Sequence, residues 1–479
     1  MKHKLEEYFR KLKINHITAN SKEIESNSAF FAIKGLVHDG NEYINEAISS
    51  GAKLIFTTQK DLANDHNIIY LENTREAIAL AAEIIYPNTP PKIVAVTGTN
   101  GKSSVVSYVH QILSLLGKRS ASIGTLGVEC NVVFEQVSTD GLTTYDPVIF
   151  RKLLHNLYAA GVEYVALEAS SHGLDQNRLG NLKVDCAGFT NLSQDHLEYH
   201  KTMDSYLAAK MKLFTTHLKR DSKALIDKEI SVFKQVVAQL SSESIECEVI
   251  GDDIEIIEVL GSIREQRVKY SIDNKIYEFN TNIIGSFQAN NLLMAARMAY
   301  HLGINYNQIH DVLPKVEAVC GRLQKIESNT EMNIFIDYAH TPDALEKSLL
   351  ELKKLCPNKS QLIVLFGCGG DRDPSKRMVM GQVATKIANQ VVITDDNPRT
   401  ENAANIRNQV QKGALEAKII GNRRLAILET IESLKKGDIL LIAGKGHEDY
   451  QIIGHKKIHL SDIEIAQEAI EKYECSLEK

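Results

Sequence analysis

The chain has 479 residues, of which 43% are hydrophobic and 24% are charged, and its formal net charge is -6. This length exceeds what one compact core accommodates, so we expect about two to four domains with the composition of a soluble globular protein. The mixed charges with a negative sum, and the lack of any apolar run near the ~20 residues that span a bilayer, argue against nucleic-acid and membrane binding.

The first segment, residues 1–90, carries strand-like runs at 29–33, 53–57 and 68–71, together with two short helices. It ends in Tyr86-Pro87-Asn88-Thr89-Pro90-Pro91, where closely spaced prolines block helix and remove backbone donors. We therefore expect a small domain followed by a linker.

The second segment, residues 91–323, opens with the continuous apolar run 93–96, which is typical of a buried parallel strand. A glycine-rich turn follows. The next stretch predicts a helix with one apolar stripe, made of Val105, Val109, Ile112, Leu113 and Leu116. Gly117 is placed to end that helix, and further strands are expected to end at Leu167 and Thr190.

The third segment, residues 324–479, alternates strands and helices. Its candidate strands are 333–336, 362–366, 391–394 and 439–443. A helix beginning at Pro342 has an apolar stripe made of Leu345, Leu349, Leu352 and Cys356. This alternation predicts an open parallel sheet with helices on both faces, and such sheets bind ligands at the carboxyl ends of their strands. The polar clusters of both later segments follow predicted strands, so they mark the expected site.

The cysteines indicate a reducing compartment. Seven are present, at positions 130, 186, 247, 320, 356, 368 and 475, and none forms a CxxC pair. Scattered thiols of odd number favour free cysteines over disulfides or structural zinc. Residues 1–13 are charged and lack the apolar core of a secretory signal. We therefore expect a soluble cytoplasmic protein.

A glycine-rich loop joins the strand at 93–96 to the helix that follows, with the sequence Thr97-Gly98-Thr99-Asn100-Gly101-Lys102-Ser103-Ser104. Such a loop wraps a phosphate, and the helix N-terminus offers free N–H groups. Lys102 would reach the β- and γ-phosphates, and the Ser103 hydroxyl would bind Mg²⁺. Val96 stands where the usual P-loop has its first glycine. A plain glycine turn is the alternative, but the GKS ending between a strand and an amphipathic helix favours nucleotide binding.

Further motifs follow this loop in a fixed order along the chain. They are Leu142-Thr143-Thr144-Tyr145-Asp146, EASSHGL at 168–174 with Gln176 and Arg178, NLSQDHL at 191–197, YLAAK at 206–210, Gly321-Arg322, DYAHTPD at 337–343, GCGGDRD at 367–373, DNPR at 396–399 and GKGHE at 444–448. Together with GTNGKSS at 98–104, this set resembles the motifs of the Mur ligase family over almost the whole chain.

The resemblance implies an α/β protein of three domains. These are a small N-terminal α/β domain that binds the UDP substrate (1–90), a central P-loop-type mononucleotide-binding α/β domain that binds ATP (91–323) and a C-terminal Rossmann-like α/β domain that binds the amino acid (324–479). The implied reaction begins with phosphorylation of a muramoyl-peptide carboxylate by ATP. An amine then attacks the acyl phosphate, giving an amide, ADP and phosphate. Phosphoryl transfer depends mainly on positioning and charge neutralisation.

Four residues are the implied catalytic set: Lys102, Glu168, His196 and Lys210. The implied Mg²⁺ ligands are Ser103, Glu168, His196 and Lys210 as a carbamate (N6-carboxylysine). Oxygen ligands suit Mg²⁺, and a carbamate converts a cation that the ion would repel into an anion. The alternatives are a capping or salt-bridged Glu168, a structural His196 and a solvated helical Lys210.

The resemblance also implies two groups of ligand contacts. ATP contacts are expected at Gly98, Thr99, Asn100, Gly101, Lys102, Ser103, Ser104, Asn291, Arg322 and Asp337. Contacts to the UDP-muramoyl dipeptide are expected at Ser21, Thr143, Thr144, Ser170, Gln176 and Arg178. Asn291 as a helix cap and Asp337 as a turn residue are the alternatives.

The third segment is expected to select the incoming amino acid. The candidates are Arg372, Asp396, Asn397, Pro398, Arg399, Gly444 and Glu448. The Arg399 guanidinium would pair with the distal carboxylate of meso-2,6-diaminopimelate and repel the distal ammonium of lysine. Glu448 would pair with the distal ammonium of diaminopimelate. In the alternative, Arg399 caps a loop and faces solvent.

The motifs lie nearest to those of family members that act on UDP-N-acetylmuramoyl-L-alanyl-D-glutamate. We therefore expect this compound and meso-diaminopimelate as substrates, ATP and Mg²⁺ as cofactors, and a monomer. A lysine-adding ligase and a folylpolyglutamate synthase-like ligase are the related alternatives. Folylpolyglutamate synthases lack the SSHGL and DNPR blocks. A P-loop ATPase that couples hydrolysis to movement is the alternative from another class, but it needs no third ligand-binding domain and no DNPR block.

Overall fold

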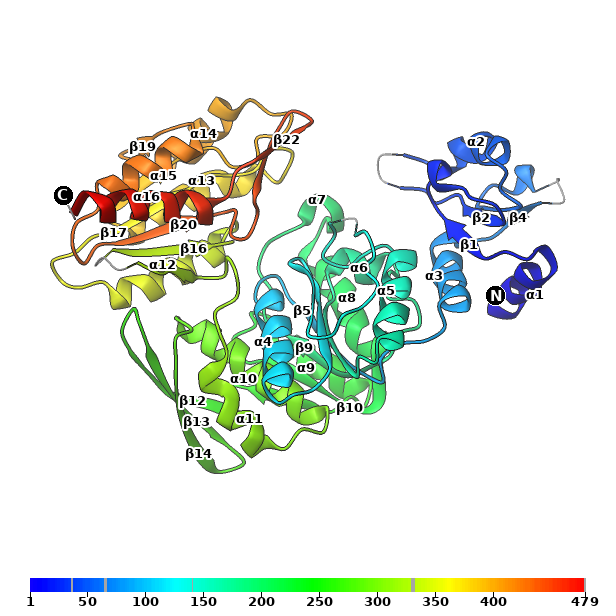
Figure 1. The fold of residues 1–479 in the computed structure, drawn as a ribbon, viewed down its shortest axis with the longest axis horizontal. Helices are drawn as coiled ribbons and strands as arrows, with labels where there is room; N and C mark the ends of the chain where they lie inside the picture. Colours follow the sequence, from blue (N-terminus) through cyan, green and yellow to red (C-terminus); the bar gives the residue numbers. More distant parts are fainter. Residues whose placement is uncertain (36–37, 64–66, 140, 329–331, 478–479) are drawn as a thin grey trace.

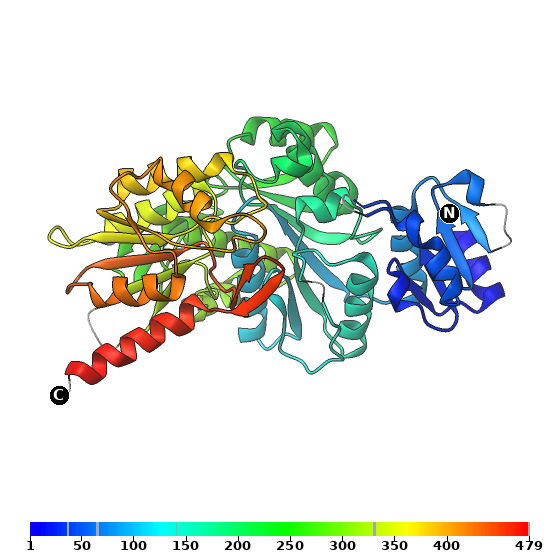
Figure 2. The ribbon, with the colours of Figure 1, turned by 90° about the horizontal axis from the view of Figure 1, so that it is seen from above.

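A computed structural model describes residues 1–479 apart from 36–37, 64–66, 140, 329–331 and 478–479. The chain forms three bodies, each built on its own sheet, and they follow one another in sequence (Figure 1). Seen from above, the bodies lie in a row with the central one in the middle (Figure 2). Six cysteines are free thiols, as expected, and Cys475 lies outside the described side chains. None of the described helices combines the length and hydropathy that crossing a membrane requires.

The N-terminal body is a four-stranded parallel sheet in the order β1-β2-β3-β4. Its elements are α1 (Lys2–Leu12), β1 (His16–Thr18), β2 (Ser28–Phe31), α2 (Ile44–Ser49), β3 (Leu54–Thr57), β4 (Ile68–Tyr70) and α3 (Thr74–Ile85). The three predicted strands are confirmed, whereas β1 was not predicted and three α-helices stand where we expected two. Stacked rings of Phe31 and Phe56, 4.6 Å between centroids, lie in its core.

The central body has a ten-stranded sheet in the order β14-β13-β12-β11-β10-β9-β5-β8-β6-β7. Its strands are β5 (Lys92–Thr97), β6 (Ser120–Gly124), β7 (Gly127–Cys130), β8 (Tyr164–Glu168), β9 (Val184–Phe189), β10 (Leu218–Asp227), β11 (Cys247–Ile250), β12 (Ile254–Gly261), β13 (Gln266–Ile272) and β14 (Lys275–Thr281). Its helices are α4 (Lys102–Leu115), α5 (Pro147–Ala159), α6 (Ser171–Asp175), α7 (Leu197–His200), α8 (Met203–Lys212), α9 (Phe233–Ser242), α10 (Ser286–His301) and α11 (Tyr306–Val312).

The predicted strand at 93–96 and the helix after it are confirmed as β5 and α4. β5 lies between β8 and β9 and runs parallel to both, so their carboxyl ends meet at one edge of the sheet. The apolar stripe of α4 is buried in the same core as α10. The antiparallel strands β12, β13 and β14 were not predicted from the sequence.

The C-terminal body has a six-stranded sheet in the order β15-β16-β20-β17-β18-β19 and a separate hairpin. Its elements are β15 (Gln324–Ile326), β16 (Asn333–Asp337), α12 (Pro342–Leu355), β17 (Leu362–Phe366), α13 (Ser375–Ile387), β18 (Gln390–Ile393), α14 (Ala403–Gln411), β19 (Lys418–Ile419), α15 (Arg423–Glu432), β20 (Ile439–Ala443), β21 (Tyr450–Ile453), β22 (Lys456–His459) and α16 (Asp462–Leu477).

The expected parallel sheet with helices on both faces is confirmed for β16 to β20. One apolar core includes residues of α12, α13 and α14, and a second, on the opposite face, includes residues of α15 and α16. The prediction was incomplete at the sheet edge, where β15 pairs antiparallel with β16. That strand is three residues long, too short for its pattern to distinguish it from a loop.

Candidate active site

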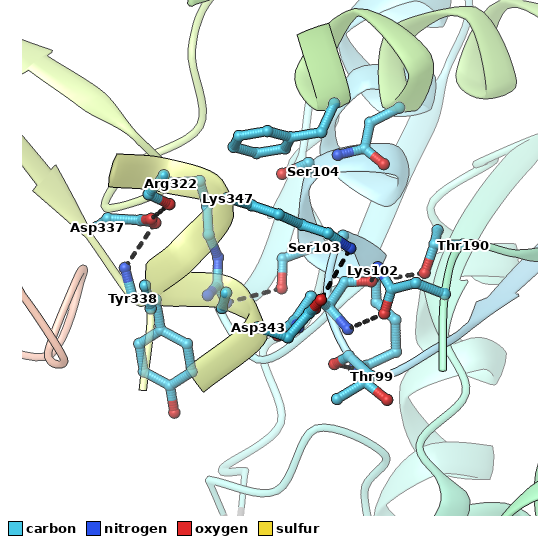
Figure 3. A pocket seen from close by; sticks show the side chains of 18 of the residues that line it. Thr99, Lys102, Ser103, Ser104, Thr190, Arg322, Asp337, Tyr338, Asp343 and Lys347 are labelled. Atoms are coloured by element: carbon cyan, nitrogen blue, oxygen red, sulfur yellow. Dashed lines mark hydrogen bonds and ion pairs between the residues drawn. The ribbon is translucent and has the colours of Figure 1, made fainter. Parts of the chain in front are cut away.

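A cavity of about 800 Å³ lies where the central and C-terminal bodies meet (Figure 3). The residues of the sequence prediction that line it come from both bodies. They are Thr99, Asn100, Gly101, Lys102, Ser103, Ser104, Thr143, Glu168, His196, Asn291, Arg322 and Asp337. Side chains more than 200 positions apart in the chain are thus assembled at one site.

The loop between β5 and α4 has a backbone that its glycines make possible. Gly98 and Gly101 have φ values of 148° and 84°, in the region that favours glycine. A Cβ on Gly98 would lie 2.0 Å from the Thr190 hydroxyl. Thr190 donates to the Asn100 carbonyl at 2.5 Å, and the Asn100 N–H donates to the Asn191 side chain at 2.8 Å. The loop is therefore fixed against the end of β9.

The N-terminus of α4 opens into this cavity. Its N-cap is Gly101, which provides no side-chain cap, so the first-turn N–H groups keep their capacity to bind an anion. Two lysines donate hydrogen bonds to backbone carbonyls of the loop. Lys102 Nζ donates to the carbonyls of Gly98 and Thr99 at 3.0 and 2.8 Å, and Lys210 Nζ donates to Gly98 at 2.8 Å.

Lys210 is buried, with 1% of its surface exposed, and its ammonium lies 4.3 Å from the centre of the Tyr206 ring. The alternative of a solvated lysine is therefore wrong. Burial lowers the pKa of Lys210 well below its usual value, and the charge of Lys102 lowers it further. Burial also lowers the pKa of Lys102, against the opposing effect of the Glu168 carboxylate.

Glu168, at the end of β8, presents its carboxylate to the floor of the cavity. Its two oxygens accept hydrogen bonds from the N–H and hydroxyl of Thr125, at 2.9 and 3.1 Å. A Cβ on Gly124 would lie 2.2 Å from this carboxylate, so glycine is required there. The Ser103 hydroxyl, in the same cavity, accepts a hydrogen bond from Arg322 at 2.9 Å.

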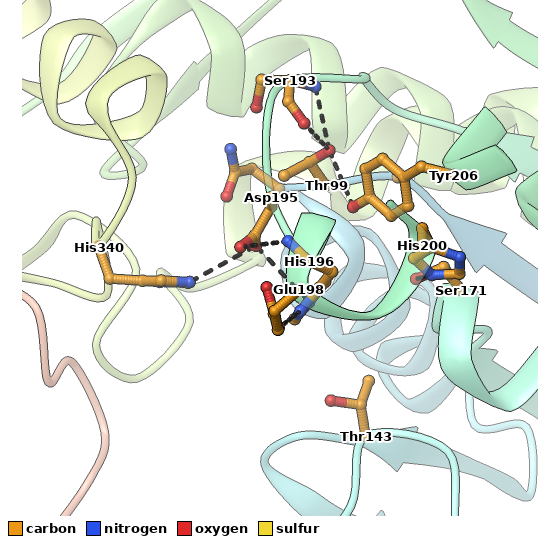
Figure 4. A network of polar contacts seen from close by, with 12 residues as sticks. Thr99, Thr143, Ser171, Ser193, Asp195, His196, Glu198, His200, Tyr206 and His340 are labelled. Atoms are coloured by element: carbon orange, nitrogen blue, oxygen red, sulfur yellow. Dashed lines mark hydrogen bonds and ion pairs between the residues drawn. The ribbon is translucent and has the colours of Figure 1, made fainter. Parts of the chain in front are cut away.

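A polar network borders the loop on its other side (Figure 4). His196 has a left-handed backbone, φ 56°, and its ring lies 3.6 Å from Asp195 and 3.5 Å from Glu198. His340, from the C-terminal body, lies 3.8 Å from the same Asp195 carboxylate. Burial alone would raise the pKa of Asp195, but the neighbouring imidazoles of His340 and His196 hold it well below its usual range.

Three predicted nucleotide contacts come from α10, from the segment before β15 and from the end of β16. Asn291 lies within α10 and donates to the Gln288 side chain at 3.0 Å, so its interpretation as a helix cap is wrong. Gln288 in turn donates to the Arg322 carbonyl at 3.0 Å. Asp337 accepts from the N–H groups of Leu323 and Tyr338 at 3.2 and 2.8 Å. Burial raises the pKa of Asp337, although its hydrogen bond from Ser348 opposes the shift.

The predicted substrate contacts divide into two groups. Thr143 lines the large cavity, whereas Thr144 and Ser170 hold the end of β8 behind it. Thr144 donates to the Glu168 carbonyl at 2.9 Å, and Ser170 accepts from the Gly173 N–H at the start of α6. Thr144 therefore fixes the Glu168 backbone, and Ser170 caps α6.

Gln176 and Arg178 line a second cavity of about 100 Å³, shared with Arg75 of the N-terminal body. The Gln176 side-chain oxygen accepts from Arg178 at 2.9 Å and from Arg75 at 3.5 Å. Ser21 is buried in the N-terminal body and lines neither of these cavities.

The predicted amino-acid contacts gather at the carboxyl ends of β17, β18 and β20, outside the lining of the large cavity. Asn397 donates to Glu448 at 2.9 Å, and a Cβ on Gly444 would lie 2.9 Å from the Asp396 carboxylate. Arg399 donates to the Gly370 carbonyl at 2.7 Å. Burial, together with the charge of Arg372, lowers the pKa of the Arg399 guanidinium. Arg399 is thus partly buried beside a second guanidinium.

The hairpin β21–β22 holds the loop 396–399 that carries these residues, including Pro398. The Arg399 N–H donates to the Ile452 carbonyl at 3.0 Å, and the Ile452 N–H donates to the Asn397 side chain at 2.9 Å. The Gln451 side chain donates to the Asp396 carbonyl at 2.6 Å. The loop and the hairpin form one unit.

Sequence reasoning missed several residues of the site. Asp195 and His340 stand inside quoted motifs, so the motifs themselves carried the signal. Thr125 and Lys347 line the cavity without a motif that distinguishes them, and Lys347 pairs at 3.2 Å with Asp343, the last residue of the DYAHTPD motif (Figure 3). Their roles depend on contacts between distant segments.

The donor atoms in the cavity can be compared with the ligands that Mg²⁺ prefers. Among the described residues, no group of three or more His, Cys, Asp or Glu side chains converges on one position. The cavity instead offers the Ser103 hydroxyl and the Glu168 carboxylate beside the phosphate loop. Mg²⁺ accepts such oxygen donors, and it is commonly held by one or two protein ligands together with phosphates and water. These residues therefore fit Mg²⁺.

Three family models match the chain. They are described as "Mur ligase family, catalytic domain" over residues 13–86, "Mur ligase middle domain" over 96–299 and "Mur ligase, glutamate ligase domain" over 321–446. These matches follow the order of the three sheets along the chain.

Full-length relatives agree with these models. A Rickettsia typhi protein named UDP-N-acetylmuramoyl-L-alanyl-D-glutamate–2,6-diaminopimelate ligase is 45% identical, covering 99% of this chain and 97% of its own. A protein of the same name from Agrobacterium fabrum is 37% identical, covering 97% and 95%. A solved structure of a ligase with this name superposes with a TM-score of 0.68 at 29% identity, covering 96% and 95%. With this similarity along its whole length, the chain belongs to the Mur ligase family.

Proposed function

We propose that the protein is the ATP-dependent ligase that adds meso-2,6-diaminopimelate to UDP-N-acetylmuramoyl-L-alanyl-D-glutamate through an acyl phosphate. Such a reaction serves peptidoglycan precursor synthesis, and through it cell-wall biogenesis, cell shape and division. The observation that carries the proposal is the cavity that joins the phosphate loop, Glu168 and Arg322 between two bodies, in a chain 45% identical to a ligase of that name. We propose domains at 1–90, 91–323 and 324–479, and a monomeric cytoplasmic enzyme.

The first step is transfer of the ATP γ-phosphoryl group to the dipeptide carboxylate. Two anions must approach each other, so cationic groups and N–H donors at the phosphates lower the barrier. Lys102, Arg322 and the N-terminus of α4 lie at the cavity for this role. Ser103 and Glu168 would hold Mg²⁺, which supplies charge neutralisation at the phosphate oxygens when it is bound.

We propose that Lys210 works as a carbamate. Its ammonium and that of Lys102 share the Gly98 carbonyl, so a buried cation and a partly buried one repel each other. A neutral amine is the form that adds CO₂, and burial favours the neutral form here. The resulting anion would pair with Lys102 and, together with His196, would suit a second Mg²⁺.

The second step is attack of the amino acid's amine on the acyl phosphate. The cluster around Asn397, Arg399 and Glu448 would hold the amino acid by its distal end. The distal end of diaminopimelate carries both a carboxylate and an ammonium, so it matches guanidinium and carboxylate together. Lysine lacks the carboxylate.

Replacement of Arg399 by alanine is expected to lower kcat/KM for diaminopimelate at least 100-fold, because the distal carboxylate of diaminopimelate loses its guanidinium partner. The KM for ATP is expected to change less than threefold, since Arg399 does not line the large cavity. Initial rates at varied substrate concentrations measure both. The Arg424→Ala variant, which removes an exposed guanidinium paired with Glu468, is the matched control. Equal losses for ATP and diaminopimelate would remove the basis for this assignment.

ADP release by the purified protein tests the proposed function itself. ADP is expected to form at a steady rate only when ATP, the UDP-linked dipeptide and diaminopimelate are all present, because the amine completes the cycle. Mass spectrometry then identifies the amide product, and lysine in place of diaminopimelate serves as the comparison. Rapid ADP release with neither acceptor present would support a P-loop ATPase instead, and a lysine product would support the lysine-adding alternative.

A further inference from the structure

Lys445 is a fully buried cation inside the predicted amino-acid cluster, and no step described above uses it. Its side chain is 0% exposed, and Gly444 and Gly446 flank it with φ values of 109° and 54°. Its Nζ donates to the Glu448 carboxylate at 3.1 Å and to the Asn397 side-chain carbonyl at 3.3 Å. It thus contacts two of the residues expected to bind the amino acid.

The hydrogen bonds on Glu448 are unevenly distributed. Lys445 and Asn397 both donate to Oε2, at 3.1 and 2.9 Å. Within the described part of the chain, no side chain donates to Oε1. Two donors on a single oxygen fix the rotation of the carboxylate and keep its second oxygen available. Lys445 therefore sets the direction in which Glu448 accepts a ligand.

The charges near Arg399 extend this role. The groups that act on Arg399 are Arg372, Asp396, Glu448 and Asp371. With Arg399, these groups comprise two guanidiniums and three carboxylates, and the charge of Lys445 brings the sum over these six groups to zero. Without Lys445 the cluster would carry a net negative charge close to the bound amino acid. Because Lys445 is buried, its charge is little screened by solvent.

We propose that Lys445 is a positioning and specificity-determining residue that makes the cluster favour a zwitterionic distal group over a cationic one. This inference rests on the proposed function. The distal head of diaminopimelate is a zwitterion with no net charge, whereas that of lysine is a cation. One unit of charge in the cluster therefore changes lysine binding much more than diaminopimelate binding. The amino-acid preference follows the net charge of the cluster.

A charge series tests this proposal, with kcat/KM for diaminopimelate and for lysine as the readout. Lys445→Met makes the cluster more negative by one unit, Glu448→Gln makes it more positive by one, and the double variant restores the original sum. Lysine use relative to diaminopimelate is expected to rise at least tenfold in Lys445→Met, equal to about 1.4 kcal/mol. It is expected to fall in Glu448→Gln and to return toward the wild-type value in the double variant. The KM for ATP stays within twofold.

Lys457→Met is the matched control. Lys457 also lies over the Tyr450 ring, at 3.7 Å, as Lys445 does at 5.3 Å, but it is exposed on β22. Its removal is expected to leave the preference unchanged, because solvent screens its charge. A preference that rises equally in both lysine variants, or in neither, would overturn the proposal.

A folding defect, or a failure of the proposed function, can be distinguished from a failure of the role proposed for Lys445. Lys445→Met leaves a half-buried carboxylate without its cation, so thermal unfolding is recorded for every variant. If Lys445→Met does not fold, the proposal is tested by comparing Glu448→Gln with the double variant. The double variant must use lysine at least tenfold better, relative to diaminopimelate, than Glu448→Gln, and equal ratios overturn the proposal. A wild-type protein that uses neither amino acid contradicts the proposed function, whereas a diaminopimelate-specific wild type with no charge-ordered series contradicts only the role of Lys445.

Discussion

Replacement of Lys102 by methionine is expected to lower the rate of ADP formation about 10³-fold, equivalent to about 4 kcal/mol in the barrier. Lys102 is the first residue of α4, and its ammonium reaches the carbonyls of Gly98 and Thr99 within the phosphate loop. Negative charge accumulates there as the phosphoryl group moves between two anions. Methionine keeps the length of the side chain and removes the charge.

The fold is expected to tolerate this change. Lys102 is a partly buried cation, so its removal also relieves a desolvation cost, and the Gly98 carbonyl keeps its hydrogen bond from Lys210. Thermal unfolding is expected at the wild-type temperature or above it. Steady-state rates with all three substrates measure the catalytic effect. A loss smaller than tenfold in a folded variant would place the phosphates elsewhere.

Replacement of Lys210 by alanine is expected to cause a loss of similar size, about 10³-fold, since it removes both the buried amine and the carbamate that we propose. Short carboxylic acids such as acetate are expected to raise the activity of the Lys210→Ala variant at least tenfold, because the vacated space accepts a carboxylate in the carbamate's place. In the wild type, ¹³C-bicarbonate is expected to give a carbamate signal in carbon NMR, and the Lys210→Ala variant none.

Lys212 supplies the matched control for this experiment. It lies two positions further along α8, but it is exposed and pairs with Asp175 at 2.7 Å. Lys212→Ala is expected to retain activity within twofold and to keep the NMR signal. If acetate fails to rescue Lys210→Ala and the wild type gives no carbamate signal, Lys210 acts only as a structural donor to the Gly98 carbonyl.

The parts that sequence reasoning found are those whose physical signal is local. The phosphate loop could be predicted because the strand, the glycines and the helix that shape it are adjacent in the chain. The buried strands β16, β17 and β20 are continuous apolar runs, and their boundaries were predicted within a residue. Position relative to these strands then placed the polar clusters at the correct edge of each sheet.

The parts that it missed depend on encounters between distant segments. Gln288 belongs to none of the motifs quoted above, yet it supports both Asn291 and the Arg322 backbone. Lys210 could be distinguished from a solvated lysine only through its burial beneath the loop. The strands β12 to β14 alternate exposed and buried residues over a weakly buried surface, so their apolar pattern is faint. None of these contacts and burial patterns could be predicted from the spacing of residues along the chain.

The hydrogen bonds between the loop 396–399 and the hairpin β21–β22 limit how the choice of amino acid can change, in evolution or in the laboratory. Grafting the four loop residues from a relative with another preference would leave them seated on a foreign hairpin. The hydrogen bonds that Arg399 and Asn397 make with Ile452 would then have to form with a hairpin of different sequence. Successful exchange calls for transplanting both stretches together, as one cassette.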